Sequence, residues 1–286
     1  MKKSYLNLTG KIDKKKIECI ELISDVTKSL AIPFFIIGAV ARDMILMHGY
    51  GIKTIRATYD IDFAIRVQNW QRFNELKNDL IKLDEITETK EIQRMKYHKN
   101  IVFDLIPFGP IADKDSTIKW PPSNDIVFNI IGFNEAYKYA QNVLLREKSH
   151  LEVKIVNLPC LAFMKLFSWN DGNYDRRSKD ASDLALILMK YTEADNFERI
   201  LNEAEDLLES EEFDYVYAGA RLLGRDLSLI LTPAIKNKVL EILNHETEKE
   251  SLYRLIEDML INKFNHDQTF EYMLKLLIEL RLGLED

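Results

Sequence analysis

Three aspartates on two apolar segments are the residues best suited to chemistry. Asp60 and Asp62 belong to the run Asp60-Ile61-Asp62-Phe63, and Asp104 interrupts an apolar run over residues 101–106. Because a strand alternates its faces with a period of two, Asp60 and Asp62 point the same way. If the two strands are neighbours, all three carboxylates converge, and a divalent cation relieves their repulsion. The pattern predicts a metal-dependent phosphoryl-transfer site.

The alternative for an isolated Asp-x-Asp pair is a solvated strand edge. Two further features favour a site here: a short apolar strand that ends at Gly38 and leads into a helix, and the second apolar strand around Asp104. A glycine at a helix N-terminus lets a phosphate approach free backbone amides and the positive end of the helix dipole.

The surrounding pattern supplies elements to position these residues. We expect helices over 13–31, 39–48 and 69–83, and a polar loop over 53–58. Strands are expected over 34–37, 60–67, 94–98, 100–108, 143–146 and 151–156. After Pro159 nearly every segment has helical spacing, with one helix ending at Gly224 before a solvated Arg225-Asp226 pair. The sequence predicts an α+β fold, with a mixed sheet and flanking helices in a domain over 1–157 and an all-α domain over 158–286.

Composition restricts the function. The chain has 286 residues, 47% hydrophobic and 30% charged, with a net charge of -7. This acidic balance argues against a surface that coats nucleic acid, although it permits a local basic patch. Two cysteines and five scattered histidines provide no disulfide framework and no zinc pattern. With no apolar run long enough to span a membrane, we expect no membrane partner and a cytoplasmic location.

The order strand, glycine, helix, polar loop and Asp-x-Asp strand resembles the nucleotidyltransferase superfamily that includes DNA polymerase β. The segments that carry the resemblance are Ile36 to Arg42 and Arg56 to Phe63. The closest similarity is to the AbiEii-type toxin group, over roughly residues 30–190. The sequence departs from the family at Ala39 and Val40, where a second glycine and a small hydroxyl residue are usual.

The resemblance implies roles for individual residues. Asp60, Asp62 and Asp104 would hold two Mg²⁺ ions, and Asp104 would also help to activate the acceptor hydroxyl. Gly38 and Ala39 would begin the helix that cradles the triphosphate of an NTP. Arg42 and Arg56 would steer phosphates, although a surface salt bridge is the alternative for each.

A second group of polar residues lies on the predicted helices after Pro159. Lys165 interrupts the apolar run Leu161 to Trp169, and Asp180 and Asp183 share one helix face three residues apart. By resemblance Lys165 would contact phosphate and Asp180 would line or brace the nucleotide cleft. The alternative is that Lys165 extends to solvent and that Asp180 caps the helix or pairs with Arg176 or Arg177.

These residues predict a Mg²⁺-dependent nucleotidyltransferase that moves an NMP from an NTP to an acceptor hydroxyl or phosphate. No Walker-type or dinucleotide-binding glycine motif competes with this interpretation. By resemblance the acceptor is a tRNA end, a protein or a small molecule, and a toxin–antitoxin or phage-defence setting would add a cognate antitoxin as partner. A tRNA acceptor would require a basic patch, for which the candidates are Lys53, Arg56, Arg94, Lys96 and Lys99. The alternative function is a non-catalytic nucleotide-binding or protein-interaction module that retains the fold.

Overall fold

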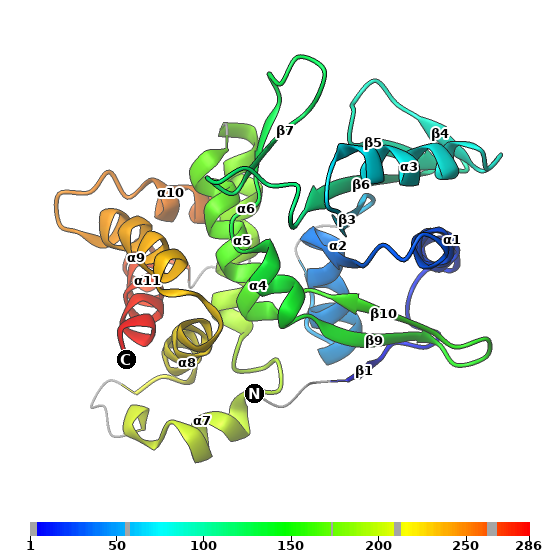
Figure 1. The fold of residues 1–286 in the computed structure, drawn as a ribbon. Helices are drawn as coiled ribbons and strands as arrows, with labels where there is room; N and C mark the ends of the chain where they lie inside the picture. The colour runs from blue at the N-terminus through cyan, green and yellow to red at the C-terminus, as the bar shows by residue number, and fades with distance from the viewer. Residues whose placement is uncertain (1–4, 55–57, 173, 209–212, 262–267) are drawn as a thin grey trace. The chain divides into compact units, whose positions relative to one another are not determined.

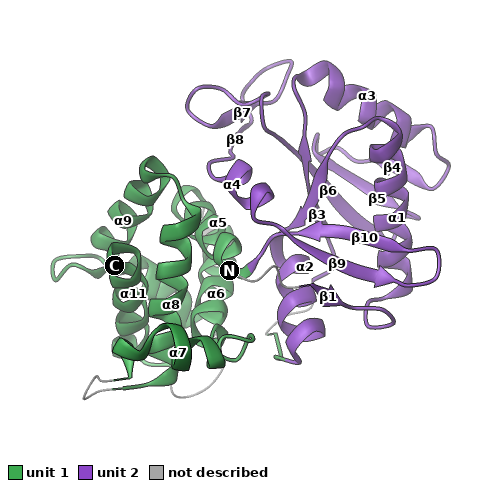
Figure 2. Ribbon diagram, turned by 60° about the horizontal axis from the view of Figure 1, so that its bottom comes forward, with its two compact units in different colours: residues 1, 52–55, 158–286 green, residues 2–51, 56–157 purple. Residues whose placement is uncertain are grey.

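The computed structural model describes residues 5–54, 58–172, 174–208, 213–261 and 268–286. The chain divides into two compact units, one of residues 2–51 and 56–157 and the other of residues 1, 52–55 and 158–286 (Figure 2). Each unit is described by itself. Arg56 lies outside the described residues.

The first unit is built on an eight-stranded mixed sheet with the strand order β1-β9-β10-β2-β3-β6-β5-β4 (Figure 1). A separate two-stranded sheet pairs β7 with β8. The strands are β1 (Leu6–Asn7), β2 (Phe34–Ile37), β3 (Ile61–Arg66), β4 (Ile86–Glu88), β5 (Arg94–Tyr97), β6 (Ile101–Phe108), β7 (Thr117–Lys119), β8 (Val127–Asn129), β9 (Gln141–Arg146) and β10 (Leu151–Ile155).

Among its described residues, four α-helices and one π-helix complete this unit. They are α1 (Lys14–Ser29), α2 (Gly38–Asp43), the π-helix η1 (Met44–Gly49), α3 (Trp70–Ile81) and α4 (Phe133–Lys138). Helix α1 packs against α3 and β6, while α2 contacts β2 and β3. The side chains of Phe63, Phe73 and Phe103 are almost fully buried in the core. Burial of this apolar surface is what fixes the central strands in place.

The second unit is entirely helical among its described residues. Its elements are α5 (Leu158–Asp171), α6 (Tyr174–Lys190), α7 (Phe197–Glu203), the short 3₁₀ helix η2 (Glu205–Leu207), α8 (Tyr215–Ile230), α9 (Pro233–Thr247), α10 (Arg254–Ile261) and α11 (Phe270–Glu285). The predicted α+β class, a mixed sheet with helices followed by a run of helices, is confirmed.

The sequence pattern predicted that a helix ends at Gly224, and this prediction is wrong. Helix α8 continues to Ile230, and Gly224 packs directly on Gly283 of α11. A Cβ added at Gly224 would lie 2.8 Å from the Gly283 Cα and closer still to the Leu280 carbonyl. The absence of a side chain therefore serves the close approach of two helices rather than a helix terminus.

The predicted solvated Arg225-Asp226 pair is also wrong. Asp226 is 1% exposed and accepts hydrogen bonds from Arg199 at 2.7 and 2.8 Å and from the Tyr191 hydroxyl. Arg225 instead reaches Asp206 and Asp286. Burial beside Asp226 raises the pKa of the Tyr191 hydroxyl well above its usual range. A buried carboxylate needs such partners because an unpaired one would be costly.

Several short elements were not predicted, among them β1, β4, the β7–β8 hairpin and α4. The predicted helix over 39–48 is divided in the structure, because α2 ends at Asp43 and a π-helical turn follows to Gly49. Among the described helices, none combines the length and the apolar character needed to cross a lipid bilayer.

Candidate active site

A single row of residues crosses the centre of the sheet. In the antiparallel pair of β2 and β3, Ile37 lies opposite Asp62; in the parallel pair of β3 and β6, Asp62 lies opposite Asp104. Across the antiparallel pair of β5 and β6, Asp104 lies opposite Arg94. Residues opposite one another on neighbouring strands share a face of the sheet. The structure therefore brings Asp62, Asp104 and Arg94 together on one face.

Asp60 joins this group from just outside the sheet. It was predicted within a strand, but β3 begins at Ile61, so Asp60 lies in the segment that enters the strand. Its side chain is 46% exposed, whereas that of Asp104 is 11% exposed. The three carboxylates thus run from a solvent-facing position at Asp60 to a largely buried one at Asp104.

Gly38 lies directly against Asp62. The residue has a φ of +71°, a left-handed conformation that favours glycine, and it begins α2 at the end of β2. A Cβ added there would lie 2.9 Å from Cγ of Asp62 and closer still to Oδ2. The N-cap residue of α2 is Ile37, whose side chain cannot accept a hydrogen bond from the first amides of the helix. The turn and the carboxylate are therefore parts of one compact arrangement.

Arg94 is the cation that the sequence analysis did not place in this site. Its Nε and Nη2 donate hydrogen bonds of 2.8 and 2.9 Å to the two oxygens of Asp104. The same guanidinium lies 3.7 Å from Asp60 and 3.4 Å from Glu91. The hydrogen bonds from Arg94 to Asp104 raise the pKa of Arg94 above its already high ordinary value. Arg94 therefore carries a permanent positive charge between Asp60 and Asp104.

This arrangement bears on the predicted magnesium site. Carboxylate oxygens are the ligands that Mg²⁺ prefers, so the donor set has the right chemistry. Yet among the described residues no three histidine, cysteine, aspartate or glutamate side chains are grouped so that they could hold a metal ion. At Asp104, both carboxylate oxygens accept hydrogen bonds from Arg94.

The other predicted nucleotide contacts in this unit have structural partners. Arg42 is fully buried, and it donates to Asp43 at 2.6 and 2.9 Å and to the Thr58 hydroxyl at 3.4 Å. The Thr58 carbonyl also accepts from Lys16 at 2.7 Å. These contacts fix the segment that leads into Asp60. Ala39 is buried as well, in the first turn of α2.

Lys165 and Asp180 form a separate buried cluster in the helical unit. The Lys165 ammonium lies 2.7 Å from Asp180 and 2.8 Å from Asp183, and the Ser168 hydroxyl donates to Asp180 at 2.7 Å. Burial lowers the pKa of Lys165, but the two carboxylates raise it by more, so the net shift is upward. Lys165 does not extend to solvent, and Asp180 is paired with Lys165 rather than with Arg176 or Arg177.

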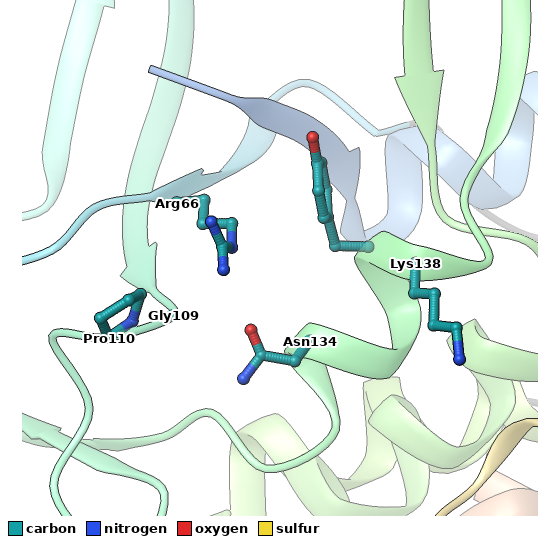
Figure 3. Close-up of a pocket in the computed structure, with 6 residues that line it drawn as sticks. Arg66, Gly109, Pro110, Asn134 and Lys138 are labelled. Atoms are coloured by element: carbon teal, nitrogen blue, oxygen red, sulfur yellow. The ribbon is translucent and has the colours of Figure 1, made fainter. Parts of the chain in front are cut away.

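A shallow pocket lies at the far ends of β3 and β6. It is lined by Arg66, Gly109, Pro110, Asn134, Tyr137 and Lys138, and Figure 3 shows the Arg66 and Asn134 side chains pointing into it. Arg66 lies four residues beyond Asp62 on the same strand, which corresponds to about 13 Å. The pocket is therefore distinct from the carboxylate row but lies on the same pair of strands.

The structure describes four of the five candidates for a basic patch, all but Arg56. Arg94 is engaged by carboxylates, and Lys96 lies two residues farther along β5 with an exposed side chain.

The contact between Arg94 and Asp104 could have been found in the sequence. Residues 94–97 and 101–104 flank a three-residue turn, His98 to Asn100, in which His98 and Lys99 have positive φ. Counting outward from that turn places Arg94 opposite Asp104.

Comparison with known proteins identifies a family. The family model described as "Nucleotidyl transferase AbiEii toxin, Type IV TA system" matches residues 25–271. No curated protein matches the chain.

Three of the solved structures that resemble this chain are the following. The lincosamide antibiotic adenylyltransferase LnuA, with lincomycin bound, is 14% identical, with 62% of this chain and 96% of that chain covered and a TM-score of 0.36. ANT(2″)-Ia in complex with adenylyl-2″-tobramycin is 13% identical, with 69% of this chain and 100% of that chain covered and a TM-score of 0.38. The Thermotoga maritima CCA-adding enzyme complexed with tRNA is 13% identical, with 97% of this chain and 82% of that chain covered and a TM-score of 0.28. These similarities are too loose to assign a substrate.

Proposed function

Since the chain belongs to the AbiEii family of nucleotidyltransferase toxins, we propose that the row containing Asp62 and Asp104 is its catalytic centre. The proposed reaction transfers an NMP from an NTP to an acceptor and releases pyrophosphate. The observation that carries this proposal is the register of β3 and β6, which puts Asp62 opposite Asp104, together with the contact of Asp62 on the Gly38 turn.

The proposed reaction has one bond change at the α-phosphorus. An oxygen of the acceptor forms a bond to this phosphorus while the bond to the oxygen that bridges to the β-phosphate breaks. The electron pair leaves with pyrophosphate. When the acceptor is a hydroxyl, Asp104 would orient it and receive its proton through the lone pairs that the two hydrogen bonds from Arg94 do not use.

The metal and the phosphates have proposed positions in the same group. Asp60 and Asp62 would hold Mg²⁺, which when bound supplies positive charge to the phosphates and to the leaving oxygen. Gly38 would let the triphosphate approach the first amides of α2, as the family resemblance implies. Buried Arg42 would act indirectly, because its contact with Thr58 positions the segment that carries Asp60.

The acceptor is proposed as a tRNA end, a protein or a small molecule that carries a hydroxyl or a phosphate. The pocket around Arg66 and Lys138 offers two cations and the Tyr137 ring to an anionic acceptor. Its distance from Asp62, about 13 Å along β3, suits an extended acceptor better than a compact one. The type IV toxin–antitoxin description of the family also supports a cognate antitoxin as a partner.

The test is transfer of label from α-³²P-labelled NTPs in the presence of Mg²⁺. Purified protein is incubated with total RNA, with cell protein and with small hydroxyl compounds, each with the four nucleotides in turn. We expect label on one acceptor class and loss of at least about 10²-fold in Asp62→Asn. Asp84→Asn is the matched control, because Asp84 is exposed after α3. Absence of transfer to all acceptors would favour a non-catalytic binding module and overturn the proposal.

A further inference from the structure

The pocket at the ends of β3 and β6 contains an arginine whose charge is not compensated. The Arg66 side chain forms no hydrogen bond or ion pair with the residues that the structure describes. Figure 3 shows its guanidinium pointing into the pocket, on the side where Asn134 also points inward. None of the described residues that line the pocket is acidic. An arginine with no carboxylate beside it can bind an anion from outside the protein.

The backbone holds this arginine in place. Arg66 ends β3 and lies opposite Phe108 of β6, which Gly109 follows. Gly109 has a φ of +92°, and a Cβ added there would lie 3.0 Å from Cγ of Arg66. The lack of a side chain at Gly109 therefore leaves room for the Arg66 side chain, in a backbone conformation that glycine adopts readily.

Two lysines add positive charge around the same pocket. Lys138 of α4 lines it, and the Lys154 ammonium lies 4.5 Å from the centre of the Tyr137 ring, which also lines it. That ring is fixed by its packing on Phe35 and Phe108, at centroid distances of 5.7 and 5.8 Å. Together with the arginine, three cations therefore surround one pocket.

The two units of the chain carry opposite charge. The unit that contains the sheet has 23 lysine and arginine residues against 20 aspartate and glutamate residues, whereas the helical unit has 16 against 26. The net charges are +3 and -10, although the sheet unit includes the carboxylate row. Such an asymmetry within one chain indicates that the basic part binds an anionic partner. The overall charge of -7 therefore does not argue against a polyanion at the sheet unit.

We propose that this pocket binds a phosphate group through the guanidinium of Arg66, with Lys138 and Lys154 beside it. Arginine matches phosphate because its planar fork donates two parallel hydrogen bonds to two oxygens. The pocket is shallow, which suits a phosphate within a polynucleotide strand better than a small molecule that must be enclosed.

The position of the pocket relates this phosphate to the carboxylate row. Asp62 and Arg66 lie on the same face of β3, about 13 Å apart, a distance that a helical strand spans in about four nucleotides. The bound phosphate would then belong to the acceptor. This role rests on the proposed function and deepens it, whereas the binding itself does not depend on catalysis.

Binding is measured without Mg²⁺ and without NTP, so that turnover does not enter. Fluorescence anisotropy follows a labelled RNA strand on the full chain at several salt concentrations, and calorimetry follows inorganic phosphate alone. For three cations on a single strand, the logarithm of the binding constant should fall with the logarithm of salt concentration with a slope of about -2. Arg66→Gln should weaken binding of the strand by about 10-fold. It should also reduce the steepness of the salt dependence by about 0.7.

The matched control is Lys148→Gln. Lys148 is exposed in the turn between β9 and β10 of the same unit, and its side chain forms no ion pair with a described residue. Its loss removes one charge from the unit and should change binding by less than about 2-fold. Arg66→Lys, which keeps the charge without the planar fork, should bind with an affinity between those of Arg66→Gln and the wild type. Far-ultraviolet circular dichroism and thermal melting of each variant establish that it is folded.

Two outcomes support the site and identify the source of the phosphate. An RNA strand that binds the wild type and loses affinity in Arg66→Gln assigns the pocket to a polynucleotide. Inorganic phosphate that binds while the strand does not, and that depends on Arg66, assigns the pocket to a small phosphorylated compound.

The remaining outcomes separate this inference from the proposed function. No binding of either probe, an unchanged affinity in Arg66→Gln, or equal losses in folded Arg66→Gln and Lys148→Gln would overturn the phosphate site and leave label transfer untouched. Asp62→Asn should bind the strand as the wild type does, because Asp62 does not line the pocket. A strand bound through Arg66 without transfer to any acceptor would overturn the proposed function and leave the phosphate site standing.

Discussion

Replacement of Gly38 by alanine tests whether the turn and the carboxylate act together. The added Cβ would lie 2.9 Å from Cγ of Asp62 and closer to Oδ2, whereas ordinary contacts begin at 3.4 Å. The Asp62 carboxylate must therefore move by at least 0.5 Å, the difference between these two distances, and by more at Oδ2. A misplacement approaching 1 Å in a catalytic group can lower the rate by about 10²-fold.

Backbone strain contributes a second, separable effect. A non-glycine residue in the left-handed region costs roughly 1–2 kcal/mol, and Gly38 has a φ of +71°. Gly51 provides a close match, because its φ is +72° and an added Cβ would meet nothing within 4 Å. Gly51→Ala should therefore show a similar loss of stability with transfer activity retained.

The assay is label transfer from an α-³²P-labelled NTP, together with urea denaturation of both variants. We expect Gly38→Ala to lose about 10²-fold in transfer rate and Gly51→Ala to lose little. The reasoning is refuted if both variants lose activity equally, since strain alone would then explain the effect. It is also refuted if Gly38→Ala retains full activity, because Asp62 would then tolerate displacement.

Three further predictions concern the helical unit. Gly224→Ala should destabilise by about 1–3 kcal/mol in urea denaturation, because its Cβ would force α8 and α11 apart, whereas exposed Leu229→Ala on α8 should change stability by less than about 0.5 kcal/mol. Lys165→Met should lower the free energy of unfolding by about 3–5 kcal/mol, because the buried carboxylates of Asp180 and Asp183 would lose the ammonium that they share. Asp286→Asn should cost about 1 kcal/mol at pH 7, since solvent screens this exposed pair, and clearly less at pH 2, with Glu285→Gln as the near-neutral control.

The sign of the pH effect follows from the pKa of Asp286. Hydrogen bonds from Arg221 and Arg225 lower it to about 2 from an ordinary value of 3.8. A carboxylate whose folded-state pKa is lowered stabilises the folded protein above the unfolded-state pKa, and this contribution disappears as the pH falls through the folded-state value. A difference between wild type and Asp286→Asn that does not shrink between pH 4 and pH 2 would contradict the assignment.

Outcomes for the other two variants are equally direct. If Gly224→Ala gains stability, the helix propensity of alanine outweighs the contact with Gly283, and the packing argument is wrong. An unchanged denaturation midpoint in Lys165→Met would show that water reaches Asp180 and Asp183 more readily than their burial indicates.

The sequence identified the three carboxylates but not the side chains that surround them. The sequence placed Asp62 and Asp104 on apolar strands and predicted that they would converge if these strands were neighbours, and the register of β3 and β6 shows that they are. The pairing itself could not be derived, because β3 and β6 are parallel and joined by a long connection, so no turn sets their alignment. The contact of Arg94 with Asp104 could have been counted from the turn after β5.

Longer-range packing accounts for the remaining differences. The glycine at 224 has the local pattern of a helix end, and only the partner helix α11 explains why it lies inside α8. Asp226 similarly looks solvent-exposed until Arg199 and Tyr191 are brought to it by the fold. Short strands such as β7 and β8 have three residues each, too few for a periodicity to be recognised.

Alignment of the reactive side chains by strand register has a consequence for variation among related proteins. The segment between β3 and β6, residues 67–100, can change in length without altering which residue lies opposite Asp62. Insertions in this segment would change the surface that it forms, while the spacing of Asp62 and Asp104 stays the same. A single residue inserted within β6 upstream of Asp104 would instead move the Asp104 carboxylate to the opposite face of the sheet and abolish the proposed transfer activity.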